Sequence, residues 1–218
     1  MTDLAEPIGK FIVFEGGEGT GKSTQSQLLI EYLREQGKQA IITREPGGTP
    51  GAESIRTMLL DPLGDGWNAQ SEALLFAAAR ADHVAKLIKP ALAEGNWVVC
   101  DRFVDSSRAY QGGAGGLGDA AIRTLHDFGS AGLRPDCTIL LEVDQARLAR
   151  RLAARDGDQS DAIGGRALDY HEKVAAAFRE IAERDPQGIV RIDGTGTPAE
   201  VHQRVVAVAA AQFGDALP

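Results

Sequence analysis

Residues 16–23 of this chain read Gly16-Gly17-Glu18-Gly19-Thr20-Gly21-Lys22-Ser23, and they indicate its fold. The stretch matches G-x-x-x-x-G-K-[ST], the phosphate-binding loop or P-loop, whose backbone N–H groups surround a polyphosphate. In that motif the lysine reaches the β- and γ-phosphates, and the hydroxyl of the last residue holds Mg²⁺. Lys22 and Ser23 are therefore predicted to serve a bound nucleotide and its metal ion.

The residues around the loop have the pattern that the motif requires. Residues 10–14 are a short apolar run typical of a buried strand. Residues 22–36 carry apolar side chains at helical spacing. A strand, a loop and a helix in this order bring the positive end of the helix to the phosphates.

The same alternation of short apolar runs and helical periodicity continues to the C-terminus. Such alternation predicts parallel strands joined by right-handed helical crossovers. We therefore expect one three-layer α/β domain spanning residues 1–218, with a five-stranded parallel sheet. The expected strands are 10–14, 39–43, 96–100, 136–142 and 188–192. The expected helices are 22–36, 51–60, 70–93, 119–128, 144–155, 167–184 and 198–212.

The composition excludes several classes of protein. A net charge of −8 argues against general binding to nucleic acids or to membrane surfaces, although a local group of arginines can still bind an anionic substrate. The start of the chain lacks the pattern of a signal peptide, and no apolar run is long enough to span a membrane. Cys100 and Cys137 lie at apolar runs and are expected to be buried free thiols. A cytoplasmic enzyme is the expectation.

Two stretches rich in glycine interrupt the pattern. Residues 111–118 are expected to be either a flexible connector or a mobile wall of a substrate pocket. Residues 155–166 have the length and composition of a lid. The two ends, 1–9 and 214–218, are expected to be loose.

Charged residues follow two of the predicted strands. Asp101-Arg102 ends the third strand, where a carboxylate can hold Mg²⁺ and an arginine can face phosphates, unless the two form a plain surface pair. Arg44 follows the second strand and precedes Pro46-Gly47-Gly48, which indicates either a second anion site or an ordinary turn. Because ligands of open α/β sheets bind beyond the strand C-termini, these residues are expected to lie near the P-loop.

Two further pairs could contact a nucleobase. Phe76 and Arg80 lie four residues apart on one helical face, so a ring for stacking lies beside a guanidinium for a base carbonyl. Taken alone, Phe76 fits an ordinary core position better. Tyr110-Gln111 likewise joins a ring to an amide.

Several separate motifs together resemble bacterial thymidylate kinases from about residue 10 to residue 213. They include Phe14-Glu15-Gly16 with the P-loop, Thr43-Arg44-Glu45-Pro46-Gly47-Gly48-Thr49, Ala78-Ala79-Arg80, Asp101-Arg102-Phe103, and Ser106-Ser107 with Ala109-Tyr110-Gln111-Gly112. The resemblance implies phosphoryl transfer from ATP to dTMP, giving ADP and dTDP for dTTP biosynthesis. It also implies Mg²⁺ as cofactor and a homodimer.

The resemblance also implies the site residues. Lys22 and Arg102 would be catalytic, and Ser23 and Asp101 would hold the metal. The implied ATP-binding residues are Gly16, Gly17, Glu18, Gly19, Thr20, Gly21, Lys22, Ser23 and Thr24. The implied dTMP-binding residues are Glu18, Arg44, Phe76, Arg80, Arg102, Ser107, Tyr110 and Gln111. Within this set Glu18 would contact the deoxyribose 3′-OH, and Glu15 would support the loop.

One position departs from the family pattern. This P-loop has no arginine, so the lid would have to supply the cation for the transition state. The family's usual Asp-Arg pair in the lid falls here on Asp161-Ala162, so the expected arginine is absent. Arg155, backed by Arg151, is the hypothesis for the lid cation, and Arg166 lies a few residues further on.

Two other functions compete with this interpretation. A kinase of another nucleotide could use the same fold. A nucleotide-dependent switch would need a base-reading N-K-x-D motif, which the chain lacks. The turn Asp193-Gly194-Thr195-Gly196 is interpreted either as a wall of the adenine pocket or as a plain turn. The four histidines are expected to be surface or helix residues without a catalytic role.

Overall fold

The computed structural model describes residues 9–144, 148, 162, 164, 166 and 168–217. Its centre is a five-stranded sheet in the order β2-β3-β1-β4-β5, and every neighbouring pair is parallel. The predicted fold class is therefore confirmed. The strands are β1 (Phe11–Glu15), β2 (Ala40–Arg44), β3 (Trp97–Asp101), β4 (Cys137–Glu142) and β5 (Ile189–Asp193).

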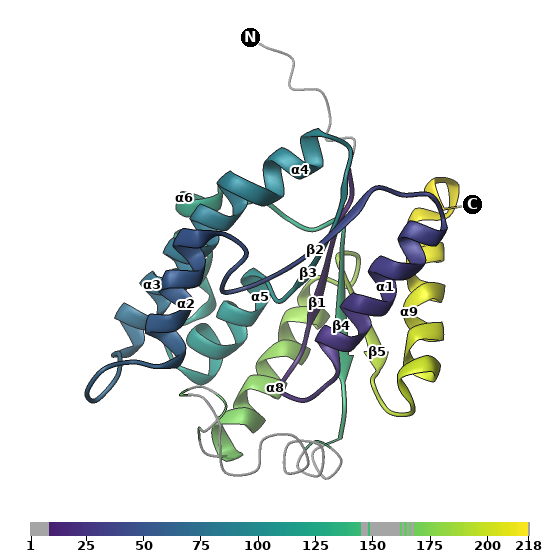
Figure 1. The fold of residues 1–218 in the computed structure, drawn as a ribbon. Coiled ribbons are helices and arrows are strands. Elements are labelled where there is room, and N and C mark those ends of the chain that lie inside the picture. Colours follow the sequence, from purple (N-terminus) through teal and green to yellow (C-terminus); the bar gives the residue numbers. More distant parts are fainter. Residues whose placement is uncertain are drawn as a thin grey trace.

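Helices cover both faces of the sheet (Figure 1). Ile12 and Phe14 of β1 pack on one face in a core shared with α1 and α9. Phe11 and Val13 point to the other face, where the segment Val84–Ala93 covers them. The α-helices are α1 (Lys22–Glu35), α2 (Pro50–Leu60), α3 (Ala69–His83), α4 (Lys89–Ala93), α5 (Val104–Ser107), α6 (Asp119–Ser130), α8 (Leu168–Arg184) and α9 (Pro198–Phe213). Two π-helical segments, η1 (Val84–Ile88) and η2 (Arg108–Ala114), and a 3₁₀ turn, η3 (Gly214–Ala216), complete the described elements.

The register of the sheet brings the polar residues together at one edge. Arg44 at the end of β2 pairs with Asp101 at the end of β3, and Asp101 also pairs with Phe14 of β1. The P-loop leaves β1 at Glu15 at this same edge. Three segments that are far apart in the sequence therefore meet beyond the carboxyl ends of three adjacent strands, as expected for an open parallel sheet.

The structure differs from the expected elements in the region after β3. Residues 104–114 are helical, and the glycine-rich stretch 111–118, expected to be either a flexible connector or a mobile wall of a substrate pocket, starts inside η2. The glycines there allow close packing against α8, because a Cβ on Gly113 would lie 2.6 Å from the Cβ of Ala177. Gly112 is buried, and Gln111 lines the cleft described below. Here glycine serves a close helix contact rather than chain flexibility.

Other expectations differ at the ends of elements. The helix expected at 70–93 is continuous but contains the π-helical segment η1 between α3 and α4. The C-terminal residues are not loose, since Leu217 is buried against the core shared by α1 and α9. Most of the helix expected at 144–155 and most of the lid expected at 155–166 lie outside the described residues. None of the helices among the described residues has the length and hydropathy needed to span a bilayer.

Candidate active site

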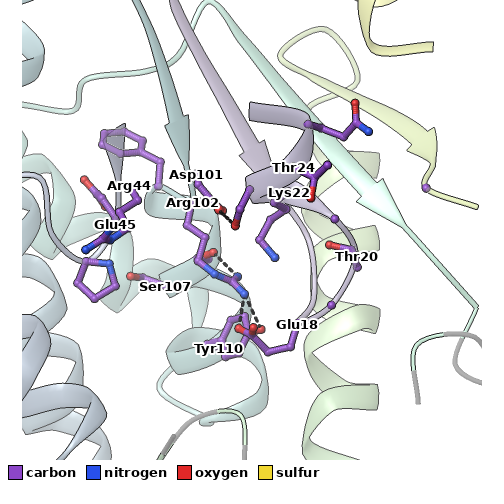
Figure 2. Close-up of a pocket in the computed structure, with 18 of the residues that line it drawn as sticks. Glu18, Thr20, Lys22, Thr24, Arg44, Glu45, Asp101, Arg102, Ser107 and Tyr110 are labelled. Atoms are coloured by element: carbon purple, nitrogen blue, oxygen red, sulfur yellow. Dashed lines mark hydrogen bonds and ion pairs between the residues drawn. The ribbon is translucent and has the colours of Figure 1, made fainter. Parts of the chain in front are cut away.

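A cleft of about 740 Å³ lies at the carboxyl edge of the sheet. It is a single cavity, and Figure 2 shows its lining side chains converging from the P-loop and from the ends of β2 and β3. The predicted site residues that line it are Glu18, Gly19, Thr20, Gly21, Lys22, Ser23, Thr24, Arg44, Phe76, Arg80, Asp101, Arg102, Ser107, Tyr110 and Gln111. The structure therefore brings nearly all of the predicted set into one place.

The P-loop is closed by its own side chains. The Lys22 ammonium donates to the carbonyl oxygen of Gly17 at 2.6 Å, and the Thr20 hydroxyl donates to the same oxygen at 3.0 Å. Burial and the nearby positive charge of Arg102 lower the pKa of Lys22 to about 8. A buried ammonium that donates to a neutral carbonyl can exchange this contact for a phosphate oxygen, with which it forms a stronger, charge-assisted hydrogen bond.

A hydroxyl and a carboxylate meet beside the loop. The Ser23 hydroxyl donates to Asp101 Oδ2 at 2.5 Å. The other carboxylate oxygen, Asp101 Oδ1, is buried and has no hydrogen-bond partner among the described residues. Buried polar atoms are normally satisfied, so an orphaned carboxylate oxygen indicates a missing partner of positive charge or with a donor group. The Ser23–Asp101 pair fits the oxygen ligands that Mg²⁺ prefers.

Arg102 connects the two halves of the cleft. Its guanidinium donates to the Gly16 carbonyl and to the Ser106 hydroxyl, both at 3.0 Å, and forms an ion pair with Glu18. It also lies 5.2 Å from the centre of the Tyr110 ring (Figure 2). Its φ of 71° is in the left-handed region, which is uncommon for a residue other than glycine and is found at functional positions.

Glu15 fixes the segment that follows Arg102. One carboxylate oxygen accepts from the backbone N–H groups of Phe103 (2.8 Å) and Ser106 (3.0 Å), and the other accepts from the Ser106 hydroxyl at 2.6 Å. The sequence suggested that Glu15 supports the P-loop, whereas these contacts stabilise the start of α5. Burial, with a smaller contribution from Asp105, raises the pKa of Glu15 to about 7.

The raised pKa makes stability depend on pH in a predictable direction. The folded state binds a proton on Glu15 more tightly than the unfolded state, so the contribution to the free energy of unfolding is largest at low pH and is lost as pH rises through 7. Relative to Glu15→Gln, the stability of the parent chain should therefore fall by about 2–3 kcal/mol between pH 5 and pH 8. Urea unfolding of both proteins at the two pH values measures this difference. Glu94→Gln, at an exposed side chain, is the control and should show no such change.

Arg44 and Arg56 lie at the mouth of the cleft. Arg44 forms an exposed ion pair with Glu53 at 3.2 Å, and Arg56 donates to the Pro46 carbonyl at 2.8 Å. The sequence did not single out Arg56, which lines the same cavity. The sequence did contain a signal for Arg56, namely an arginine about two helical turns after the Pro-Gly-Gly turn. The exposed Arg44–Glu53 pair is weak, so Arg44 can change partners at low cost.

Buried carboxylates hold the groups that were predicted to contact a base. Arg80 Nε donates to Glu45 Oε2 at 2.7 Å, and its Nη2 donates to the Ser107 hydroxyl at 2.8 Å. Gln111 Nε2 donates to Glu72 Oε1 at 2.8 Å. Sequence analysis missed the roles of Glu45 and Glu72. No local signal marks these two acids, because their burial depends on the partners Arg80 and Gln111 from distant segments.

Several other expectations can be compared with the structure. All four histidines lie in helices, which agrees with the expectation of surface or helix residues, and two of them, His83 and His126, are buried. Gly194 and Gly196 line the cleft, which supports the first interpretation of that turn, as a wall of the pocket. Arg151 and Arg155 lie outside the described residues.

Arg166, at the end of the predicted lid, does not stand over the P-loop in the structure. Its guanidinium forms an ion pair with Glu72 and lies 4.7 Å from the centre of the Tyr170 ring. The Tyr170 hydroxyl in turn donates to the Tyr110 carbonyl at 2.9 Å. Arg166 therefore stabilises the end of the cleft lined by Tyr110 and Gln111 rather than the end formed by the P-loop.

The fold and the site together define a P-loop kinase that acts on a small phosphorylated acceptor. The sequence profile of the family described as Thymidylate kinase matches residues 14–205. The chain therefore belongs to the thymidylate kinase family. It transfers a phosphoryl group from ATP to dTMP and gives ADP and dTDP.

Individual relatives agree with this assignment. A thymidylate kinase from Rhizorhabdus wittichii is 54% identical over 198 residues, which cover 91% of this chain and 95% of the relative. One from Rhodopseudomonas palustris is 46% identical over 199 residues, with 90% and 86% covered. The crystal structure of thymidylate kinase from Ehrlichia chaffeensis superimposes with a TM-score of 0.74 at 34% identity and covers 92% of this chain and 98% of that one.

Proposed function

We propose that ATP binds at the P-loop end of the cleft and dTMP at the end lined by Arg44, Phe76 and Tyr110, with Arg102 between the two phosphate groups. The main support for this division is that one cavity is lined both by Lys22 at one end and by Phe76 at the other. A dTMP phosphate oxygen is already a nucleophile, so catalysis needs positioning and neutralisation of charge rather than a strong base. The residues of the cleft supply both.

The donor half uses the P-loop. The backbone from Gly16 to Thr24 would surround the ATP phosphates, and Lys22 would bind the β- and γ-phosphates. Gly194 and Gly196 would lie against the adenine. Arg204 holds their turn through bonds to the carbonyls of Asp193 (2.6 Å) and Thr195 (2.7 Å).

The acceptor half combines cations with aromatic rings. Arg44 and Arg102 would hold the dTMP phosphate, and Phe76 would stack on thymine while Arg80 donates to a thymine carbonyl. Tyr110 would lie against the deoxyribose, and Glu18 would accept from its 3′-OH. Ser107 and Gln111 complete this half, since Ser107 holds Arg80 and Gln111 would help to close the base pocket.

A structure of the protein with dTMP and a non-hydrolysable ATP analogue tests this division directly. We expect thymine on Phe76 and the γ-phosphate beside Lys22. Thymine on the side of Gly194, with the analogue absent from the P-loop, would refute the assignment. Activity on dTMP, dUMP and dCMP, measured by ADP production, provides the complementary test, because equal rates would contradict base recognition by Arg80.

Mg²⁺ is proposed as the cofactor, with Ser23 and Asp101 as the residues that would hold it. When bound, the ion neutralises charge on the transferring phosphoryl group. Asp101→Asn is expected to raise the Mg²⁺ concentration for half-maximal velocity by about 10- to 100-fold. A titration of velocity with MgCl₂ measures it. Asp169→Asn, on the exposed side of α8, is the control, and equal half-saturation of all three proteins would contradict the assignment.

The lid cation is proposed to be Arg155, backed by Arg151, because the P-loop itself carries no arginine. An arginine that contacts the transferring phosphoryl group raises kcat by a factor of about 10³–10⁵. Arg155→Ala should lower kcat by that factor, measured with both substrates saturating. Arg184→Ala, which breaks only an exposed pair with Glu180, is the control. A loss below tenfold at Arg155 would reject the hypothesis.

A homodimer is proposed from the exposed apolar side chains on two adjacent helices. Leu74 of α3 is 57% exposed and Phe128 of α6 is 92% exposed. Large exposed apolar side chains on neighbouring elements are typical of interaction surfaces. Sedimentation velocity measures the state directly, and a monomer at micromolar concentration would refute this proposal.

We infer, finally, that the chain works as one domain in the cytoplasm. Lining residues of the cleft come from Glu18 near one end of the chain and from Val201 near the other, which supports a single unit. Fractionation of cells that express the protein tests the location, and activity in the membrane fraction would contradict it.

A further inference from the structure

His83 and Arg80 share one buried carboxylate. The two residues lie three positions apart on α3, so they project from the same side of the helix. Arg80 Nε donates to Glu45 Oε2 at 2.7 Å, and His83 Nδ1 lies 3.0 Å from Glu45 Oε1. All three side chains are at least 95% buried. The carboxylate is thus held from both oxygens, one by the guanidinium and one by the imidazole.

The imidazole of His83 is itself fixed from the opposite side. Its Nε2 lies 2.7 Å from the Thr43 hydroxyl. With Nδ1 donating to the carboxylate, Nε2 shares a hydrogen bond with the Thr43 hydroxyl, so both ring nitrogens have a partner. The turn after β2 closes over this pair, because a Cβ on Gly48 would lie 2.5 Å from both His83 Nε2 and Thr43 Oγ1. Gly48 also has a φ of 87°, so glycine suits the position both because a Cβ has no space and because the backbone is in the left-handed region.

This chain of contacts determines where Arg80 can donate. Nε is occupied by Glu45, and Nη2 donates to the Ser107 hydroxyl (2.8 Å) and to the Phe103 carbonyl (3.3 Å). Nη1 has no hydrogen-bond partner in the part of the chain that the structure describes. Arg80 lines the cleft, so the remaining N–H groups are available to a ligand there. Three fixed contacts leave the guanidinium only one orientation.

We propose that His83 is a positioning residue for recognition of the acceptor base, which holds Glu45 together with Thr43 and thereby fixes the direction in which Arg80 donates. The inference rests on the proposed function, in which Arg80 contacts a thymine carbonyl. Without the imidazole, Glu45 keeps only one of its two partners, and its carboxylate can rotate and release Nε. Arg80 then keeps its charge but loses its orientation.

The decisive variants are His83→Leu, which removes both ring nitrogens, and His83→Asn, which keeps a donor near the position of Nδ1. A lost hydrogen bond to a charged group predicts that His83→Leu raises KM for dTMP by about 10- to 100-fold. The kcat and the KM for ATP should change less than threefold. His83→Asn should restore most of the loss. The preference for dTMP over dCMP should narrow in His83→Leu, because Arg80 is only a donor and cytosine carries an amino group where thymine has a carbonyl.

A double-mutant cycle separates positioning from a general structural role. In an Arg80→Met background, His83→Leu should have no further effect on KM for dTMP, because its effect acts through Arg80. His202→Leu, at a partly buried histidine that packs on Tyr32 of α1, is the control for loss of a helical histidine. Its kinetic constants should equal those of the parent chain.

The outcomes distinguish the proposed contact of Arg80 with the base from the positioning role of His83. If Arg80→Met leaves KM and base preference unchanged, the proposed contact of Arg80 fails, and the role of His83 fails with it. If Arg80→Met impairs both but His83→Leu does not, the positioning role is overturned while the proposed function stands. Additive effects of the two substitutions, or a fall in kcat alone in His83→Leu, would also overturn it.

Discussion

Replacement of Lys22 by Met is expected to lower kcat by about 10²- to 10³-fold, the usual effect of removing one donor that faces developing charge. The side chain is buried beside the P-loop backbone, where water screens its charge poorly, so its interaction with phosphate is strong. Met keeps most of the length of the unbranched side chain and removes the charge together with the N–H donors. Steady-state rates of ADP production with both substrates saturating measure the effect.

The stability of the same variant should not fall. Burial already lowers the pKa of Lys22 to about 8, which shows that the charged form is disfavoured in the folded protein. An apolar replacement of similar volume at such a position is often neutral or stabilising. Lys10→Met, at an exposed lysine paired with Asp136, is the control for general loss of a positive charge. A kcat within fivefold of the parent value would contradict the role of Lys22.

The second large effect is expected at Arg102. Arg102→Lys should lower kcat/KM for dTMP by about 10²- to 10³-fold, because one ammonium cannot contact Glu18, the Gly16 carbonyl and Ser106 at once. The substitution keeps the positive charge, and lysine meets the same backbone strain as arginine at a φ of 71°. It therefore tests only the planar, forked geometry of the guanidinium.

Initial rates at low dTMP and saturating ATP measure this loss. Arg134→Lys, at an arginine in an exposed pair with Asp185, is the matched control and should be silent. If Arg102→Lys loses less than tenfold, the fork geometry of Arg102 is not required for dTMP, and its proposed position between the phosphate groups would be wrong.

The sheet could be predicted from the sequence to within one residue at each strand. Apolar runs such as residues 11–14 are buried on both faces, and that pattern is local. The helical segment at 104–114 was missed because its cause is not local. Gly112 and Gly113 are read from sequence as chain breakers, and only the approach of α8 explains why a helix is stable there.

The site could be predicted wherever a motif names the residue type. The P-loop, Arg44, Asp101 and Arg102 meet because parallel strands deliver them to one edge. What the motifs did not reveal is the set of buried acids behind them. A glutamate in a sequence is normally interpreted as exposed, and its burial depends on a cation or amide from a distant segment. Such pairing is a property of the tertiary structure alone.

The order of the strands has a consequence for the reaction itself. The P-loop extends from β1 and Arg44 from β2, with β3 between them, so two strand spacings, together about 9.6 Å, separate the strands that carry the proposed contacts to the two substrates. This separation is set by backbone hydrogen bonds rather than by any side chain of the cleft. Substitutions in the cleft can therefore weaken the binding of either nucleotide, while the spacing of the two strands that carry the P-loop and Arg44 stays fixed by the sheet.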